Sequence, residues 1–329
     1  MKVSVIMPAY NRGYIIAEAL GSIFAQTFPD FELIVIDDGS TDGTARALAR
    51  LDDTRLRYVR HNVNRGYSCA CNTGFREAQG EYVALLDSDD LWKPEKLAKD
   101  VEFLERHPEV DAVFTDLEKQ DGSRRVPSFM RESPCMVALL SAKHWPMEVS
   151  FTQREMYLCL LQEIPVKPTA FVIRHTALNA LGSFFDESWP AGFSDWEFLL
   201  RFSKRFRFGY IDKPLAVLRV QSDATHRLRA VADKTSVLKM LRAEATAAPD
   251  SEVRRAANAG YRDTVRHLSW EYLRRGQRLN AATALARGFL NSGDLGLLSR
   301  AAFALVRPKF HSGRHEIKTN ACKKPDNTN

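Results

Sequence analysis

The stretch "YVALLDSDDLW", residues 82–92, joins an apolar run to three carboxylates. An unbroken apolar run of this length is typical of a buried strand, and Asp87, Asp89 and Asp90 follow it directly. Alternate residues of an extended chain point the same way, so Asp87 and Asp89 can converge. Two carboxylates that close raise each other's pKa or recruit a cation. The stretch therefore predicts an acidic site at the end of a buried strand.

The first 120 residues alternate between short apolar runs and stretches with helical spacing. Strands are predicted at 3–10, 31–38, 56–61, 82–87 and 110–117, and helices at 14–26, 42–50, 67–79 and 94–106. This alternation indicates parallel strands joined by right-handed crossovers, with both faces of the sheet covered. Ligands in such sheets bind beyond the carboxyl ends of the strands. The segments there are "PAYN" (8–11), "DDGSTDGT" (37–44), "HNVNRG" (61–66) and "DSDD" (87–90).

The alternation stops after residue 120, and an irregular segment is expected up to about 165. A strand and a short helix are predicted within 167–184, followed by an amphipathic helix at 194–206. The segment 208–220 predicts a strand or hairpin, in which Pro214 requires an edge or a bend. From about 227 onward the composition is helical, and the last residues are polar and without periodicity, which predicts a disordered tail.

Composition places the chain among folded proteins of a reducing compartment. Its 329 residues are 45% hydrophobic, which is enough for a sizeable core. The sequence contains no uninterrupted run of eighteen apolar residues, so it predicts no membrane-spanning helix. The N-terminus does not resemble a signal peptide. Five cysteines, an odd number without regular spacing, argue against a disulfide framework. We therefore expect a cytoplasmic protein.

The net charge of +6 is unevenly distributed along the chain. Residues 226–329 hold 20 Lys and Arg against 9 Asp and Glu, a balance of +11, whereas residues 1–225 hold 27 against 32, a balance of −5. A basic C-terminal region could attract an anionic membrane surface or nucleic acid. It could equally be the solvated face of ordinary helices, and the sequence leaves these alternatives open.

The chemistry of the acidic stretch favours a hard divalent cation. Oxygen ligands suit Mg²⁺ or Mn²⁺, which keep positions open for water or phosphate oxygens. A calcium loop starting at Asp87 is excluded because its sixth residue is Trp92 and its twelfth is Ala98. Alternatively, the acids only precede the helix at Pro94, where negative charge contributes about 0.3–1 kcal/mol. Phosphate-binding Gly-rich motifs are missing from the sequence, so a metal at "DSD" is the candidate for neutralising a nucleotide's phosphates.

Two further carboxylates are candidates on weaker grounds. Asp38 ends the second strand and could accept hydrogen bonds from a base or ribose, while Thr41 or Asp42 would cap the next helix. Asp195, in "FSDWEFLL" (193–200), begins an amphipathic helix. It is either a first-turn acid or a general base that removes a proton from a hydroxyl nucleophile.

Three segments together resemble family 2 inverting glycosyltransferases. They are "VSVIMPAYNRGYIIAEALGSIFAQTFPDFELIVIDDGSTDGT" (3–44), "NRGYSCACNTGFREAQGEYVALLDSDDLWKPEKL" (64–97) and "FSDWEFLLR" (193–201). The resemblance covers roughly residues 1–220. It implies an α/β protein of the GT-A type, with a Rossmann-like, mostly parallel sheet flanked by helices, here followed by a helical subdomain. It also implies transfer of a sugar from a nucleoside diphosphate sugar to an acceptor hydroxyl, with inversion, in polysaccharide or glycoconjugate synthesis.

The resemblance assigns roles by position. Asp195 is the general base, and Asp89 with Asp87 binds the divalent metal, Mn²⁺ or Mg²⁺. Asp90 is interpreted as an acid at the start of a helix. The expected donor-binding residues are Pro8, Ala9, Tyr10, Asn11, Asp38, Gly66, Asn72, Asp87 and Ser88. The expected divisions are a nucleotide-sugar half at 1–120, an acceptor half at 121–225, a helical basic region at 226–310 and a tail at 311–329.

Three positions depart from the family's pattern. Cys71 stands where many members have Arg, Ser194 precedes the base in place of Glu, and Gln221 replaces a frequent His, with His226 nearby. A sugar nucleotidyltransferase would need a Gly-rich, Arg-containing loop that "PAYNRGYI" (8–15) lacks. A catalytically silent protein that binds nucleotide sugars or acts as a scaffold stays open as an alternative.

The expected partners are a nucleoside diphosphate sugar and a glycan or lipid-linked acceptor, and no nucleic acid is expected. The basic C-terminal helices indicate peripheral contact with the inner face of a membrane. Alternatively, these helices pack on the catalytic part or on a second copy of the chain, forming a homodimer.

Overall fold

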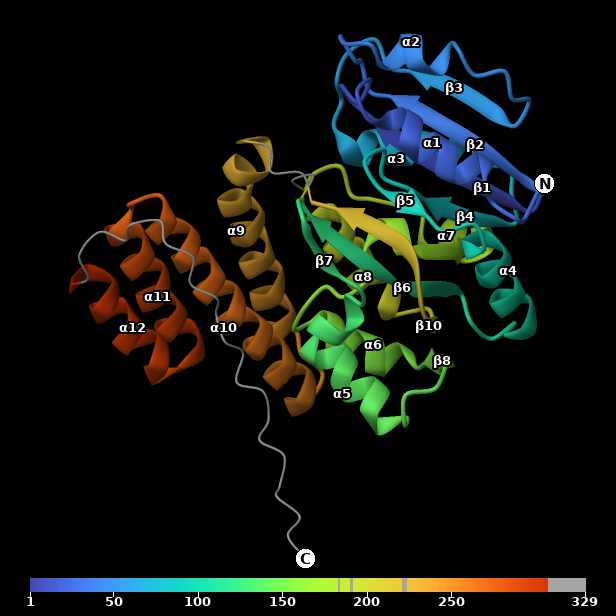
Figure 1. The fold of residues 1–329 in the computed structure, drawn as a ribbon. Helices are drawn as coiled ribbons and strands as arrows, with labels where there is room; N and C mark the ends of the chain where they lie inside the picture. Colours follow the sequence, from blue (N-terminus) through green and yellow to red (C-terminus); the bar gives the residue numbers. More distant parts are fainter. Residues whose placement is uncertain (183, 190–191, 221–223, 307–329) are drawn as a thin grey trace, which may run out of the picture.

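A computed structural model describes residues 1–306 apart from 183, 190–191 and 221–223 (Figure 1). A body built on one sheet lies on the right of Figure 1, and a group of helices lies on the left. The first half of the body contains β1 (Val3–Ala9), α1 (Ile16–Phe24), β2 (Phe31–Asp37), α2 (Thr44–Leu48), β3 (Leu56–Arg60), α3 (Tyr67–Glu77), β4 (Tyr82–Leu85), β5 (Leu91–Trp92) and α4 (Lys96–Arg106). These bounds confirm the predicted strands at 3–10, 31–38, 56–61 and 82–87 and the four predicted helices to within a few residues, whereas β5 was not predicted.

Four strands of this half form a parallel sheet in the order β3-β2-β1-β4, whereas β5 pairs antiparallel with a strand of the second half. Every residue of β1 and β2 is buried. Val5 packs in one apolar cluster with residues of α1 and α4, whereas its neighbour Ile6 packs in a second cluster with residues of α3. Both faces of the sheet are therefore covered, as the continuous apolar runs predict.

The segment between residues 121 and 165 is more ordered than the sequence analysis expected. It contains β7 (Arg124–Val126), η1 (Met130–Glu132), α5 (Pro134–Ala142), β8 (Glu148–Phe151) and α6 (Gln153–Leu160), after β6 (Ala112–Asp121). Both helices have ordinary start signals: Ser133 caps α5 and Thr152 forms a capping box with Glu155 at α6. The expectation of an irregular segment was wrong because "PCMVALLSA" (134–142) is apolar almost throughout and shows no helical period.

The sheet continues from β4 through β9 (Phe171–Arg174), β6, β10 (Phe208–Arg219) and β5. β9 runs antiparallel to both β4 and β6, and β10 runs parallel to β6. The register of β10 shifts on both sides of Pro214, so the proline lies at a bulge inside the strand. The predicted bend is confirmed. η2 (Pro168–Ala170), α7 (His175–Leu181) and α8 (Ser194–Ser203) complete this half.

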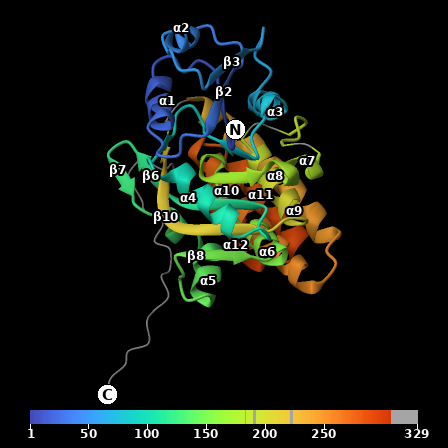
Figure 2. The ribbon, with the colours of Figure 1, turned by 90° about the vertical axis from the view of Figure 1, so that its right-hand side faces the viewer.

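The C-terminal helices are α9 (Ala224–Thr246), α10 (Ser251–Arg274), α11 (Arg278–Ser292) and α12 (Leu295–Val306), and α10 packs against α9 and α11 (Figures 1 and 2). Polar contacts join the group to the body: Arg154 of α6 pairs with Asp250 at 2.9 Å, and Tyr157 donates to Glu244 of α9 at 2.6 Å. The helical region is confirmed, although α12 was not predicted. The predicted disordered tail at 311–329 lies outside the described residues. Among the described residues, no helix has the length and apolar composition that crossing a membrane requires.

Candidate active site

The carboxyl ends of β1 and β2 bring two of the predicted loops into contact. The backbone N–H of Asn11 donates to Ser40 Oγ at 2.9 Å, and Asn11 Oδ1 accepts from the backbone N–H of Thr41 at 2.9 Å. Asn11 has a φ of 53°, in the left-handed region that Asn tolerates better than most residues. Pro8 and Ala9 are buried in β1, whereas Tyr10 is 44% exposed beside them. Tyr10 is thus open to solvent at this edge of the sheet, and its contact with a donor stays a prediction.

Asp38 connects the second strand end to the third. It is buried, and its carboxylate accepts hydrogen bonds from His61 Nδ1 at 2.7 Å and from the backbone N–H groups of Arg65 and Gly66 at 2.9 and 2.8 Å. Gly66 has a φ of 93°, which favours glycine before α3. Asp38 therefore holds the 61–66 loop in place, and its contact with a donor stays a prediction. Asp42 accepts from the backbone N–H of Thr44 at 2.9 Å, which forms a turn before α2, but Gly43 rather than Thr41 or Asp42 occupies the N-cap position of that helix.

Asp87 and Asp89 follow β4 and are both partly exposed. Tyr67 Oη donates to Asp87 Oδ1 at 2.7 Å, and the backbone N–H of Asp87 donates to Thr169 Oγ1 at 3.3 Å. Burial, together with the charge of Asp89, raises the pKa of Asp87 to about 7. Arg12 lies 3.6 Å from Asp89, between Nη2 and Oδ2. The donor set is oxygen only, and its charges destabilise one another, which fits a hard divalent cation held by Asp87 and Asp89.

Asp90 has a different role from the one expected. Its side chain is buried, and Oδ1 accepts from the backbone N–H of Arg219 in β10 at 2.9 Å. Burial raises the pKa of Asp90 well above its usual range. The residues that follow form β5, and α4 begins only at Lys96, with no acid in its first turn. The interpretation of Asp90 as a helix-start acid was wrong, because it anchors the acidic loop to β10.

Asp195 lies in the first turn of α8, as predicted, and its Oδ1 accepts from the backbone N–H of Trp196 at 2.8 Å. Burial raises the pKa of Asp195, and the charge of Lys167 partly opposes this effect. The charge of Asp195 in turn contributes to the raised pKa of Asp87. The first turn of α8 is thus within electrostatic reach of the acidic strand end. The role of Asp195 as the general base stays a prediction.

Asn72 joins the two halves of the body. Its Nδ2 donates to the Phe185 carbonyl at 2.8 Å and to Glu187 Oε1 at 3.0 Å, and its Oδ1 accepts from the Phe185 N–H at 2.9 Å. These bonds occupy the amide, and its contact with a donor stays a prediction. Ser88 is buried next to Asp87. Cys71 is fully buried in α3, and Gln221 and the side chain of His226 lie outside the described residues.

Sequence reasoning missed several side chains that shape this site. Arg12 was visible in "PAYNRG" but carried no signal that it would pair with Asp89. Tyr67 opens a helix, and nothing in its neighbourhood predicts a bond to Asp87. Lys167 and Thr169 lie in the segment 167–184, where a strand and a short helix were predicted, but no pattern there indicated that Lys167 would lie near Asp195 or that Thr169 would bond to Asp87. Arg219 was also missed, although its backbone N–H donates to Asp90 and so fixes the acidic loop to β10.

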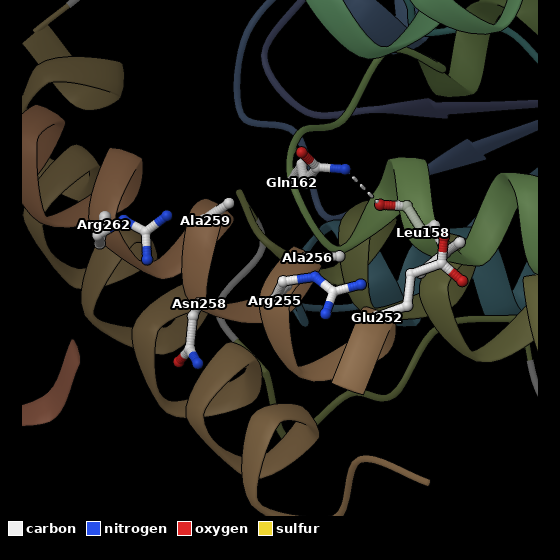
Figure 3. Close-up of a pocket in the computed structure, with 8 residues that line it drawn as sticks. All are labelled: Leu158, Gln162, Glu252, Arg255, Ala256, Asn258, Ala259 and Arg262. Atoms are coloured by element: carbon white, nitrogen blue, oxygen red, sulfur yellow. Dashed lines mark hydrogen bonds between the residues drawn. The ribbon is translucent and has the colours of Figure 1, made fainter. Parts of the chain in front are cut away.

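A separate cavity of about 480 Å³ lies between α6 and α10 (Figure 3). Its lining residues are Leu158, Gln162, Glu252, Arg255, Ala256, Asn258, Ala259 and Arg262. No predicted site residue is among them. Glu252 pairs with Arg154 and Arg262 with Asp294, so its ionic groups already have protein partners. We interpret it as a gap between docked helices, distinct from the candidate active site.

Comparison with known proteins places the chain in a family. The model of glycosyl transferase family 2 matches residues 4–181, more than half of the chain, so the chain belongs to this family. It is 42% identical over 124 residues to the putative teichuronic acid biosynthesis glycosyltransferase TuaG of Bacillus subtilis strain 168, covering 37% of this chain and 49% of TuaG. It is 35% identical over 102 residues to the Escherichia coli UDP-Glc:alpha-D-GlcNAc-diphosphoundecaprenol beta-1,3-glucosyltransferase WfgD, covering 31% and 40%. The matches thus span half or less of these relatives.

Two solved structures share the fold over most of the chain. Staphylococcus aureus TarS 1–349 in complex with UDP-GlcNAc superposes with a TM-score of 0.66 at 21% identity, covering 92% of this chain and 88% of that one. The mannosyltransferase PcManGT of Pyrobaculum calidifontis, in complex with GDP-Man and Mn²⁺, gives a TM-score of 0.57 at 24% identity, covering 94% and 81%. The chain has the GT-A fold that the resemblance implies, including helices at its C-terminal end.

Proposed function

We propose that the chain transfers a sugar from a nucleoside diphosphate sugar to a hydroxyl group of a glycan or lipid-linked acceptor, with inversion, in polysaccharide or glycoconjugate synthesis. One observation carries the proposal: Asp87, at the end of β4 beside Asp89, lies within electrostatic reach of Asp195 on α8. The two groups come from different halves of the fold. This arrangement supports a donor held at the strand ends and an acceptor delivered from the α8 side.

Asp87 and Asp89 would hold the divalent cation, Mn²⁺ or Mg²⁺. A bound cation would supply Lewis-acid stabilisation of the departing diphosphate, so that no acidic side chain is needed at the leaving group. Arg12 adds a positive charge on the same side. The exposed ring of Tyr10 and the loops fixed by Asn11 and Asp38 would hold the base and ribose.

Asp195 would remove the proton from the acceptor hydroxyl during a single displacement. Burial raises the pKa of its carboxylate, which makes it a stronger base than a carboxylate in water. The charge of Lys167 opposes this rise in the pKa of Asp195 and favours its ionised form. Burial lowers the pKa of Lys167 in turn. One face of the sugar would thus meet the base and the opposite face the leaving group, which produces inversion.

The acceptor and location are proposed from the relatives and the C-terminal helices. WfgD is named for a diphosphoundecaprenol-linked acceptor, which supports a lipid-linked acceptor here. The C-terminal region is basic, and Leu290, Leu295 and Leu305 expose apolar side chains on α11 and α12. We propose peripheral contact of these helices with the cytoplasmic face of a membrane. A homodimer formed through the same face is the competing arrangement.

Calorimetry with UDP and GDP, each with and without Mn²⁺, tests the donor site. Binding should strengthen with the metal, and Asp89→Ala should abolish this dependence. Asp52→Ala, an exposed acid in the loop before β3, is the matched control and should bind like wild type. Metal-linked binding that survives in Asp89→Ala would contradict the metal assignment. Turnover of a panel of nucleotide sugars distinguishes an enzyme from a silent binding protein.

A further inference from the structure

Cys135, Cys159 and Glu163 bring three ligand atoms together in the acceptor half. Their two sulfurs and a carboxylate oxygen all lie within 4.8 Å of one another. Cys135 is the second residue of α5, Cys159 lies near the end of α6, and Glu163 follows α6 by three residues. The cluster therefore joins two helices that pack on each other. It shares no residue with the candidate active site.

The two thiols and the carboxylate are positioned by further contacts. The hydrogen bond that the thiols share lowers the pKa of Cys135 and raises that of Cys159. Cys135 also lies at the start of α5, where the helix dipole favours a thiolate. Glu163 Oε1 accepts from Ser133 Oγ at 2.5 Å and from the backbone N–H of Cys135 at 2.6 Å. The carboxylate is therefore held against the sulfurs.

We propose that Cys135, Cys159 and Glu163 form a zinc site, with water as the fourth ligand. In a tetrahedral site, bonds of about 2.3 Å to sulfur and 2.0–2.2 Å to oxygen place neighbouring ligand atoms about 3.5–3.8 Å apart. The ligand atoms lie within 4.8 Å of one another, so each pair would have to approach by at most about 1.3 Å. Cys135 and Glu163 are partly exposed, so solvent can reach the fourth position. Thiolate ligands select zinc over Mg²⁺, which separates this site from the oxygen-only pair Asp87 and Asp89.

The zinc would act as a structural clamp. It would tie the start of α5 to the end of α6, in the same segment that leads to Lys167 and Thr169. Thr169 accepts the backbone N–H of Asp87, so this segment ends at the candidate active site. We expect zinc to stabilise the acceptor half, because a ligand that binds only the folded state raises its stability.

Metal binding is measured on the full chain, kept reduced, stripped with a chelator and then given one equivalent of Zn²⁺ or Co²⁺. Wild type should retain one zinc per chain after gel filtration, and cobalt should give the near-ultraviolet charge-transfer absorption of thiolate ligands. Cys135→Ser and Cys159→Ser should each lower zinc affinity by at least about tenfold. Glu163→Gln, which leaves both thiols in place, should weaken zinc binding and keep the thiolate absorption. Cys69→Ser, at a buried cysteine of α3, is the matched control.

The outcomes separate the zinc site from its alternatives. The thiolate absorption of the cobalt form is measured on the wild-type chain, so this test does not depend on a variant that folds. A wild-type chain without this absorption would overturn the proposal. The proposal would also be overturned if Cys135→Ser retained as much zinc as wild type. The same holds if zinc were lost only in Asp89→Ala, because the metal would then bind at the acidic strand end. Forming a disulfide between Cys135 and Cys159 requires a two-electron oxidant such as peroxide, which the reduced preparation does not contain. A Cys135–Cys159 disulfide that persists there despite the reductant, detected by mass spectrometry, would exclude the zinc site, because it leaves no thiolate ligand. Glycosyl transfer is not measured, so failure of the function proposed above would leave this test intact.

Discussion

Asp195 is the residue on which the proposed chemistry depends most. Asp195→Asn should keep the hydrogen bond from the backbone of Trp196, because the amide oxygen can still accept it. The amide cannot take the acceptor's proton, so transfer should fall by about 10²–10⁴-fold while donor binding by calorimetry stays unchanged. The control is Glu197→Gln, at the other acidic residue in the first turn of the same helix. It should transfer at close to the wild-type rate. Transfer by Asp195→Asn within tenfold of wild type would remove Asp195 from the role of base.

The three acids after β4 show what single residues reveal in a sequence. Their position after an apolar run predicted a strand end, and the structure places Asp87 and Asp89 there, partly exposed. Asp90 could not be separated from them, because its partner Arg219 lies 129 residues further along the chain. Asp38 shows the same limit, since its bonds to a distant loop are invisible in "VIDDGSTDGT". Local pattern predicts where a polar side chain stands, but tertiary neighbours decide what it does.

At the scale of elements, the contact of α10 with the end of α6 depends on Gly260. A Cβ built on Gly260 would lie 2.0 Å from the Leu161 carbonyl oxygen, a backbone atom that cannot move aside cheaply. Gly260→Ala should therefore destabilise the protein by about 1–3 kcal/mol, the range for overpacking. In Gly21→Ala, on α1, the added Cβ has no neighbour within 4 Å. This control should be stabilised by about 0.5–1 kcal/mol, because alanine favours helix. Denaturant unfolding of both variants checks the pair, and equal stabilities would refute the close contact.

Asp250 makes the start of α10 sensitive to pH. It caps the helix by accepting from the backbone of Glu252 and Val253, and it pairs with Arg154. Arg154 and these amides lower the pKa of Asp250 from 3.8 to about 2 in the folded state. A lowered folded pKa gives stability that is present above pH 3.8 and is lost as the pH falls towards 2.

Asp250→Asn should isolate this contribution, because asparagine still caps a helix but carries no charge. Its thermal midpoint should lie below that of wild type at pH 6, and the difference should shrink between pH 4 and pH 2.5. Ser251→Ala, the next residue, serves as a control whose offset from wild type should not change with pH. A difference for Asp250→Asn that persists unchanged at low pH would show that the ion pair contributes nothing.

Most elements of the first half could be predicted because β1, β2 and β4 are mainly apolar and because α1 and α4 each bury one face, whereas the two-residue β5 was not predicted. The later elements lack such patterns. α5 is apolar almost throughout, and α12 carries two apolar stripes, so neither shows one buried face. Pro214 predicted a bend, but its position inside β10 follows from pairing with β6, which no local pattern records.

For the whole molecule, the unusual feature is the surface of α12. Leu297, Ala301 and Ala304 form one stripe, buried against the other C-terminal helices. A second stripe at positions 295, 298, 302 and 305 repeats every three or four residues and is exposed. Arg300 of the same helix and Arg287 of α11 are also exposed. An apolar stripe beside basic side chains is the composition of a helix that lies on an anionic membrane surface.

We expect the full chain to sediment with vesicles that contain anionic lipid, and binding to weaken at high salt because the Debye length shortens. Replacing Leu290 and Leu295 by Asn should reduce binding without unfolding the protein, since both side chains are more than 70% exposed. Met147→Asn, an equally simple change at a 65% exposed apolar residue of the body, should bind like wild type. The membrane proposal is contradicted if neither salt nor the double substitution alters sedimentation with vesicles. If light scattering then shows that the double substitution converts a dimer to a monomer, a second copy of the chain covers this face. The lipid-linked acceptor would then have to reach Asp195 without help from α12.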